Sequence, residues 1–405
     1  MTVGVGIAGM DAPADDADDF LLLNPGPVPV TDAVRRAMDE PMVSHRSAEF
    51  EAVYRRVQDG LDYVFEHSTL SGRSTSAGGT SLALNGTATM GMEAAVANLV
   101  DEDAEVVALV NGKFGRRFAR IAERYCRCRR VAVPWGEAFD MDAVAAAITD
   151  DTDAVTVVHN ETSTGLLNPV SGVGRLAAEH DAHLLVDGVT SVGGDVFCVD
   201  DWGVDVAVTD AQKCLATPPG VSAVYVSDRV RPALDGESAP FYHDLEWHLR
   251  KAESDQTPFT SAVPLFRAMA VALDRVREEG MPVRVRRHRR QAAAFRAGFA
   301  AMGLEAFPDP TGATVRSNTV TAVALPPAAR DHPESFFRAV RERGVSVAGG
   351  QGHLAGEIFR VSNMGELDDG AVLRGVRTVG EAMAEVGVDL RVEDGVAAAR
   401  ERLRL

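Results

Sequence analysis

The sequence contains few cysteines, few aromatic residues and no long apolar run. Four cysteines in 405 residues, none of them in a CxxC pair, are too few for a disulfide framework. No stretch of about eighteen uncharged apolar residues occurs, and no basic segment followed by an apolar one opens the chain. We therefore expect reduced thiols, no transmembrane helix, no signal peptide and a cytoplasmic location.

Positive charge is also scarce. There are 41 Lys and Arg residues against 59 Asp and Glu, which gives a net charge of −18 and disfavours binding to nucleic acid or to an anionic membrane. Small molecules or proteins are the expected partners. An acidic surface with so little lysine would suit a high-salt cytoplasm, although a GC-rich genome gives the same bias. Because lysine occurs only at Lys113, Lys213 and Lys251, chemistry that needs an amine has three places to occur.

Short β-like runs alternate with helical ones between residues 80 and 230, and this pattern predicts an α/β fold with a mainly parallel sheet. Ligands of such sheets bind at the carboxyl ends of the strands. The expected strands are Glu105–Val110, Ala154–Val158, His183–Val186, Val204–Val208 and Val221–Val226.

The length predicts more than one domain. We expect a disordered acidic tail at 1–19, a large domain at 20–270, a smaller α+β domain at 271–390 and a C-terminal helical extension at 391–405. The tail contains a GxGxxG match at 4–9, but no strand precedes it, which argues against a dinucleotide site. The arginine cluster at 284–290 is expected to form a solvated helix face.

Asn85-Gly86-Thr87 follows an apolar run and precedes a helical one, so backbone N–H groups and the Thr87 hydroxyl could bind a phosphate there. The same residues could also simply turn the chain and cap the helix. Asp187 and Lys213 each come just after a predicted strand, with one helix-length connection between them. Together they match what pyridoxal phosphate requires, an amine for a Schiff base and an acid for the pyridinium nitrogen.

Seven short segments extend this pattern. They are Leu-Asn-Pro-Gly-Pro (23–27), Ser-His-Arg-Ser (44–47), Asn-Gly-Thr (85–87), Asn-Gly-Lys-Phe-Gly-Arg-Arg (111–117), His-Asn-Glu-Thr-Ser-Thr-Gly (159–165), Val-Asp-Gly-Val-Thr-Ser-Val-Gly-Gly (186–194) and Ala-Gln-Lys-Cys-Leu-Ala-Thr-Pro-Pro-Gly (211–220). In their order they resemble class V pyridoxal-phosphate aminotransferases of the alanine–glyoxylate and serine–pyruvate type, over about residues 21–385. The resemblance implies fold type I, with a large domain built on a seven-stranded type of sheet and a smaller C-terminal α+β domain.

The resemblance also implies roles for individual residues. Lys213 would carry the Schiff base and act as general acid and base, and Asp187 would pair with the pyridinium nitrogen. The other cofactor contacts that it implies are Gly86, Thr87 and Gln212 at the phosphate, Phe114 stacked on the ring and Thr162 at the ring hydroxyl.

For the substrate, the resemblance implies that Arg360 binds the carboxylate, with Gly26 beside it. On its own, Arg360 could equally be an ordinary edge-strand arginine. The segment at 256–260 resembles one that reaches the phosphate site of a neighbouring subunit, which implies a homodimer with shared active sites. Either Thr257 or Thr260 could make that contact.

The implied activity is ping-pong transamination from alanine or serine to glyoxylate or pyruvate. A dicarboxylate donor such as aspartate would need a second cation, for which Arg46 is the candidate, although Arg46 is rather expected to order the N-terminal segment. Two further alternatives are a lyase related to cysteine desulfurases and a non-catalytic binding module. Gln212 in place of a histidine before the lysine, and the lack of any cysteine after Cys214, argue against the lyase.

Overall fold

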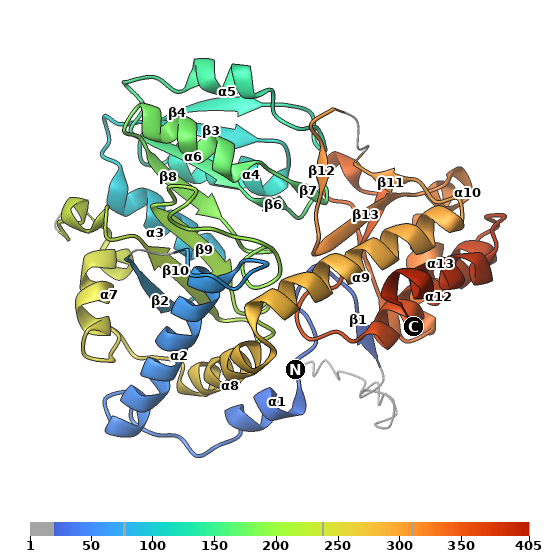
Figure 1. The fold of residues 1–405 in the computed structure, drawn as a ribbon, viewed down its shortest axis with the longest axis horizontal. Coiled ribbons are helices and arrows are strands. Elements are labelled where there is room, and N and C mark those ends of the chain that lie inside the picture. Colours follow the sequence, from blue (N-terminus) through green and yellow to red (C-terminus); the bar gives the residue numbers. More distant parts are fainter. Residues whose placement is uncertain (1–19, 76–77, 237–238, 309–311, 405) are drawn as a thin grey trace, which may run out of the picture.

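A computed structural model describes residues 20–404, apart from 76–77, 237–238 and 309–311. The expected acidic tail and its glycine-rich segment lie outside these residues. In Figure 1 a larger sheet-containing body and a smaller one lie side by side, with the long helix α9 (Met281–Ala301) running along the smaller body.

The larger body is built on a seven-stranded sheet. In spatial order its strands are β2 (Thr80–Asn85), β10 (Val221–Val226), β9 (Val206–Asp210), β8 (His183–Asp187), β5 (Ala154–Val158), β3 (Glu105–Val110) and β4 (Arg127–Ala132). Neighbouring strands from β9 to β4 are parallel, whereas β10 is antiparallel to both β2 and β9. The predicted fold class, α/β with a mainly parallel sheet, is confirmed.

Helices pack around this sheet. Their apolar residues recur at helical spacing, which gives each helix an apolar face to bury. In α2 (Ala48–His67), Phe50, Tyr54, Val57 and Leu61 are buried, and the Ser47 hydroxyl caps the first turn. The remaining helices of this part of the chain are α1 (Asp32–Met38), α3 (Ala88–Leu99), α4 (Lys113–Ala122), α5 (Met141–Ala147), α6 (Val170–Glu179), α7 (Leu245–Ala252) and α8 (Val263–Glu279).

The smaller body has a four-stranded antiparallel sheet with strands, in spatial order, β11 (Ala306–Phe307), β13 (Val320–Ala324), β16 (Ile358–Ser362) and β15 (Ala348–Gly349). Its helices are α9, α10 (Pro327–Asp331), α11 (Pro333–Glu342), α12 (Asp369–Glu385) and α13 (Val392–Leu403). A second group of buried residues fills it, including Phe299, Phe336 and Phe359. Helix α13, in the expected C-terminal extension, contributes Val396 and Ala399 to this core.

The first described residues also pack on the smaller body. Strand β1 (Leu21–Leu22) pairs in parallel with β14 (Val345–Ser346), and Leu23 belongs to the second core. A further small sheet joins β12 (Val315–Arg316), β7 (Leu166–Leu167) and β6 (Asn160–Glu161). Strands from both parts of the chain therefore pair with one another, and the chain division at 270–271 stays a prediction.

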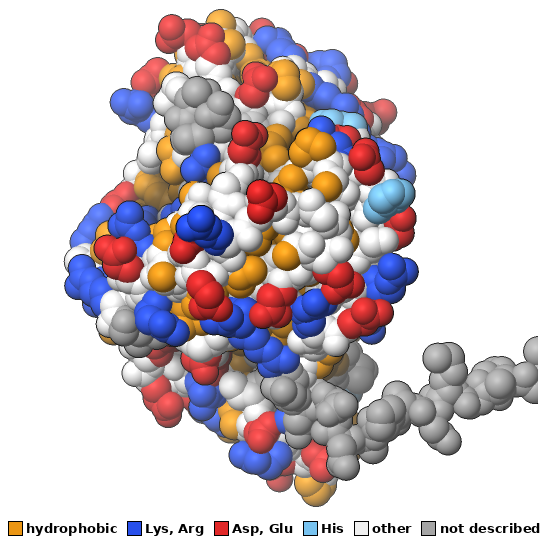
Figure 2. Space-filling model, turned by 90° about the vertical axis from the view of Figure 1, so that its right-hand side faces the viewer, with side chains coloured by type: hydrophobic (Ala, Val, Ile, Leu, Met, Phe, Trp, Pro, Cys, Tyr) orange, Lys and Arg blue, Asp and Glu red, His pale blue; other side chains and the backbone are white. Residues whose placement is uncertain are grey.

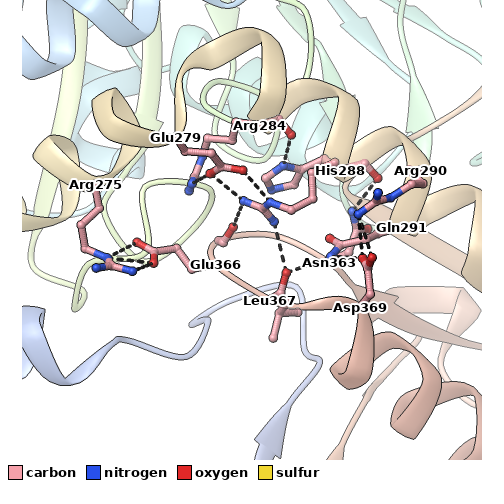
Figure 3. Close-up of polar contacts among 12 residues, drawn as sticks. Arg275, Glu279, Arg284, His288, Arg290, Gln291, Asn363, Glu366, Leu367 and Asp369 are labelled. Carbon is pink, nitrogen blue, oxygen red and sulfur yellow. Dashed lines mark hydrogen bonds and ion pairs between the residues drawn. The ribbon is translucent and has the colours of Figure 1, made fainter. Parts of the chain in front are cut away.

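The expected solvated helix face is confirmed for Arg286 and Arg290, which are exposed, and wrong for Arg284 and Arg287, which contact Glu279 (Figure 3). Arg284 is fully buried, and its Nη1 lies 2.7 Å from Glu279 Oε2. Arg287 reaches the other oxygen of Glu279 at 2.7 Å, and Arg290 pairs with Asp369 at 2.8 Å. Helix α9 contacts α8, α12 and α13, so arginines on its different sides differ in exposure.

The surface is charged and mixed. On the face drawn in Figure 2, acidic and basic side chains are interspersed rather than segregated. Among the described helices, none carries an apolar stretch long enough to cross a membrane. All four cysteines are free thiols, and Cys198 and Cys214 are buried.

Candidate active site

The predicted amine and acid meet at the carboxyl edge of the large sheet. Asp187 ends β8, Lys213 lies in the turn after β9, and these two strands are parallel neighbours. Both side chains line one cavity of about 250 Å³, while neither Lys113 nor Lys251 does. A larger hollow of about 950 Å³ near Trp135 and Phe307 has no lysine in its lining.

The cavity also brings together four further residues that the sequence predicted. Thr87, Phe114, Thr162 and Gln212 line it with Asp187 and Lys213. Gly86 directly precedes Thr87 and has φ +139°, a conformation that favours glycine. The strand–turn–helix expected at 85–87 is therefore present, with Thr87 as the N-cap of α3.

The Lys213 amine lies against the N-terminal segment. Its Nζ donates a hydrogen bond to the Pro25 carbonyl at 2.5 Å. A Cβ atom added at Gly26 would lie 2.4 Å from Nζ, and Gly26 has φ +93°, so no larger side chain fits there. Burial lowers the pKa of Lys213, with Asp210 opposing that shift, and a larger share of the amine is neutral as a result.

The groups around Asp187 offset only part of the free-energy cost of burying its carboxylate. Burial raises its pKa to about 7, while the Val189 N–H at 2.9 Å and the nearby cations Arg117 and Lys213 act in the opposite direction. A carboxyl group in this environment gains from a cationic partner inside the cavity. A protonated ring nitrogen would be such a partner.

Arg360 is not an edge-strand residue. Strand β16 lies between β13 and β15, and Arg360 is buried. Its guanidinium donates to the Gly349 carbonyl at 2.7 Å and to the Thr162 carbonyl at 2.8 Å. Thr162 lines the cavity, so Arg360 lies directly behind the wall of the site without appearing in its lining.

The structure separates Thr257 from Thr260. Thr257 is buried, and its hydroxyl contacts the Phe259 carbonyl at 2.7 Å and the Ser261 hydroxyl at 2.6 Å. Thr260 is exposed, and its carbonyl accepts a hydrogen bond from the Asn85 side chain at 2.8 Å. Neither residue lines the cavity of its own chain.

Arg46 holds this segment rather than the cavity. Its guanidinium donates to the carbonyls of Thr257 at 2.5 Å and Pro258 at 3.0 Å, and to the Gln256 side chain at 2.9 Å. These contacts tie the N-terminal segment that carries Arg46 to the loop at 256–258, and the expected ordering role of Arg46 stays a prediction. Arg46 does not line the cavity.

Sequence reasoning overlooked two charged residues of the cavity wall, Arg117 and Asp210. Arg117 lies one turn after Phe114 on α4, donates to the Thr89 hydroxyl at 2.8 Å and packs 4.9 Å from the Phe114 ring centre. Its place in the segment 111–117, three residues from Phe114, was the available signal.

Glu161 positions the aromatic wall from outside the cavity. It is fully buried, and its Oε2 accepts the N–H groups of Phe114 at 3.1 Å and Gly115 at 3.0 Å. These donors belong to the first turn of α4, whose unpaired N–H groups attract an anion. Glu161 thereby orients the helix that carries Phe114 and Arg117.

The residues present fit pyridoxal phosphate. An amine, a buried acid in need of a cation, an aromatic ring and the start of a helix surround one small cavity, and the buried Oε1 of Gln212 has no hydrogen-bond partner in the described residues. A mainly parallel sheet with this pair at neighbouring strand ends defines a pyridoxal-phosphate enzyme of fold type I.

Within that class, the chain belongs to the class V aminotransferases, whose family model matches residues 77–368. An uncharacterized aminotransferase of Methanocaldococcus jannaschii is 38% identical, over 96% of this chain and 98% of that protein. The L-aspartate–glyoxylate aminotransferase of Paracoccus denitrificans is 31% identical, over 94% and 95% of the two chains. The structure of an alanine–glyoxylate aminotransferase from a Nostoc species is similar at a TM-score of 0.82 and 30% identity, over 95% of this chain and all of that one. The protein is a pyridoxal-phosphate-dependent transaminase.

Proposed function

We propose that this aminotransferase moves the amino group of a small neutral amino acid, alanine or serine, to a small 2-oxo acid, glyoxylate or pyruvate. The observation that carries the proposal is the placement of Arg360. Its guanidinium is buried directly behind Thr162, which lines the cavity, and neither Lys113 nor Lys251 lies in that lining as a second cation. One carboxylate clamp suits a substrate with one carboxylate.

Each residue of the cavity has a distinct task in this proposal. When bound, pyridoxal phosphate supplies an electron sink for the bond broken at the substrate Cα. Lys213 would hold the cofactor and, as a free amine, would take the proton from the substrate Cα as a general base and give it up again as a general acid. Its lowered pKa helps because only the neutral amine accepts a proton.

The other residues bind and orient. Asp187 keeps the ring nitrogen protonated, Phe114 covers a face of the ring, and Thr162 binds the ring hydroxyl. Gly86, Thr87 and Gln212 receive the phosphate at the start of α3. Gly26 leaves space for the substrate beside Lys213, since any side chain there would overlap Nζ.

A dicarboxylate donor is the second candidate, and Arg117 rather than Arg46 favours it. Arg117 is a cation in the cavity wall. However, its guanidinium is hydrogen-bonded to Thr89, packs on Phe114 and lowers the pKa of Asp187, so it lies at the cofactor side of the site. We therefore assign Arg117 to the cofactor and retain a neutral donor.

We also propose a homodimer in which Thr260 reaches the phosphate site of the partner subunit. Thr260 is an exposed residue, whereas the Thr257 hydroxyl is hydrogen-bonded within its own loop. Next to Thr260, the exposed rings of Phe241 and Tyr242 pack on Phe259, and Phe241 is 74% exposed. Exposed aromatic clusters of this kind are typical of protein interfaces.

A donor screen tests the substrate proposal. The purified holoenzyme is assayed with alanine, serine, aspartate and glutamate against glyoxylate and pyruvate, in the wild type and in the Arg117→Gln variant. We expect the highest kcat/KM with alanine or serine in both proteins. A preference for aspartate or glutamate that Arg117→Gln abolishes would replace this proposal by the dicarboxylate one.

A further inference from the structure

Asp210 is a buried carboxyl group that the proposed chemistry does not use. It ends β9, is 4% exposed and lines the same cavity as Lys213. Its Oδ2 accepts the Ala88 N–H at 3.2 Å and the Gln212 amide at 2.6 Å. Its Oδ1 is buried and, within the described part of the chain, has no hydrogen-bond partner.

The two donors that Asp210 holds are those expected for a phosphate. Ala88 is the first residue of α3, and the free N–H groups of a helix N-terminus attract anions. Gln212 is the side chain that the phosphate would contact, and its own Oε1 has no partner either. The carboxyl group of Asp210 is thus placed where the negative charge of the cofactor would come.

We propose that Asp210 accommodates the cofactor's phosphate as a neutral acid, donating its proton to a phosphate oxygen, so that the affinity for the phosphate falls when Asp210 ionises. This inference rests on the proposed position of the phosphate at the start of α3. The unpartnered Oδ1 is the atom that can carry the proton, since Oδ2 already accepts two hydrogen bonds.

The groups that face Asp210 carry charges of both signs. Lys213 follows it in the same turn, Arg117 faces the cavity from α4, and Asp187 faces it from β8. From α3 comes the uncharged Ala88 N–H, and from β10 the uncharged Ser222, which pairs with Asp210 in register. Burial raises the pKa of Asp210, while the Ala88 N–H, the Gln212 amide and the charge of Lys213 oppose that shift.

The contribution of the phosphate group to binding is measured by comparing two ligands that differ only in that group. Apoprotein is titrated from about pH 5.5 to 8.5 with pyridoxamine 5′-phosphate and with pyridoxamine, neither of which forms a covalent bond with Lys213. The phosphate advantage is the Kd of pyridoxamine divided by the Kd of pyridoxamine 5′-phosphate. We expect this ratio to fall roughly tenfold or more with rising pH in the wild type, because two anions are then in contact. In Asp210→Asn the advantage should stay level or rise as the phosphate itself ionises.

Two further variants complete the experiment. Asp210→Ser, which keeps a neutral donor, should behave like Asp210→Asn and replaces it if the latter does not fold. Asp201→Asn, an exposed carboxylate paired with Arg73, should follow the wild type. If the phosphate advantage falls with pH equally in all variants, or does not change with pH in the wild type, the proposed role of Asp210 is wrong. No phosphate advantage at any pH in any protein would instead contradict the proposed phosphate site.

Discussion

At the scale of single residues, the site depends on burying charged groups whose neighbours offset the cost of burial incompletely. Asp187 has its pKa raised to about 7 by burial, and the same burial lowers the pKa of Lys213. In both residues burial disfavours the charged form. A protonated ring nitrogen beside Asp187 and a Schiff base on Lys213 would each remove part of that free-energy cost.

Asp187→Asn should therefore make the apoprotein more stable at pH 8 than the wild type, although the variant loses most of its activity. The folded pKa is raised from 3.8, so between about pH 4 and 7 the native state holds a proton that the unfolded chain has released. The free energy of unfolding of the wild-type apoprotein then falls across this range, by on the order of 3 kcal/mol. Urea denaturation at pH 5 and pH 8 measures it, and an equal fall in Asp187→Asn would contradict the assignment.

Arg360→Ala should weaken every carboxylate substrate. Loss of a desolvated charged hydrogen-bond pair typically costs about 2–5 kcal/mol, which would appear as a large decrease in kcat/KM for donor and acceptor alike. Arg330→Ala, which removes an exposed arginine paired with Glu357 in the same domain, is the control and should be near wild type. A change confined to protein stability in Arg360→Ala would argue against substrate binding.

At the scale of elements, strand ends and helix starts place the chemistry. Strands β8 and β9 bring Asp187 and Lys213 together, and residues of the first turns of α3 and α4 line the same cavity. Glu161 holds the start of α4 through the N–H groups of Phe114 and Gly115.

Glu161→Gln should loosen the aromatic wall. A neutral amide oxygen binds helix N–H groups less strongly than a carboxylate, so we expect about 1–3 kcal/mol less stability and a weaker cofactor affinity at pH 8. Fluorescence titration of apoprotein with cofactor, alongside urea denaturation, measures both. Unchanged values for both would mean that Glu161 does not position α4.

Much of this arrangement could be predicted from the chain, because the buried strands of the large sheet are largely apolar runs. Strands β3, β5 and β10 have the predicted bounds, while β4 was missed, since its Arg-Cys-Arg-Arg-Val-Ala sequence lies at the exposed sheet edge. The pairing of Asp187 with Lys213 follows from strand order. Long-range contacts account for what could not be predicted: Arg284 is buried by the packing of α9, and Arg46 binds a loop some 210 residues away, which no local pattern reveals.

At the scale of the whole molecule, the proposal is a dimer with shared sites. Lys213 and Asp187 come from one chain, whereas Thr260 would serve the partner's phosphate. Two inactive or weakened variants can therefore complement one another only if their defects lie in different halves of a site.

Mixing Lys213→Ala with Thr260→Val at limiting cofactor should restore part of the activity. In a hybrid dimer, one of the two sites then receives both an intact lysine and an intact threonine. Mixing Lys213→Ala with Asp187→Asn is the control, because both residues belong to the same chain and every hybrid site stays defective. Steady-state assays after subunit exchange measure the gain, and equal results for both mixtures, or a monomer with full activity, would contradict a shared site.

The most direct test of the account is the position of the covalent bond to the cofactor. The holoenzyme is reduced with borohydride, digested, and the labelled peptide is identified by mass spectrometry. We predict a single label on Lys213, since of the three lysines it alone lines the cavity with Asp187. A label on Lys113 or Lys251 would contradict the assignment of this cavity as the active site.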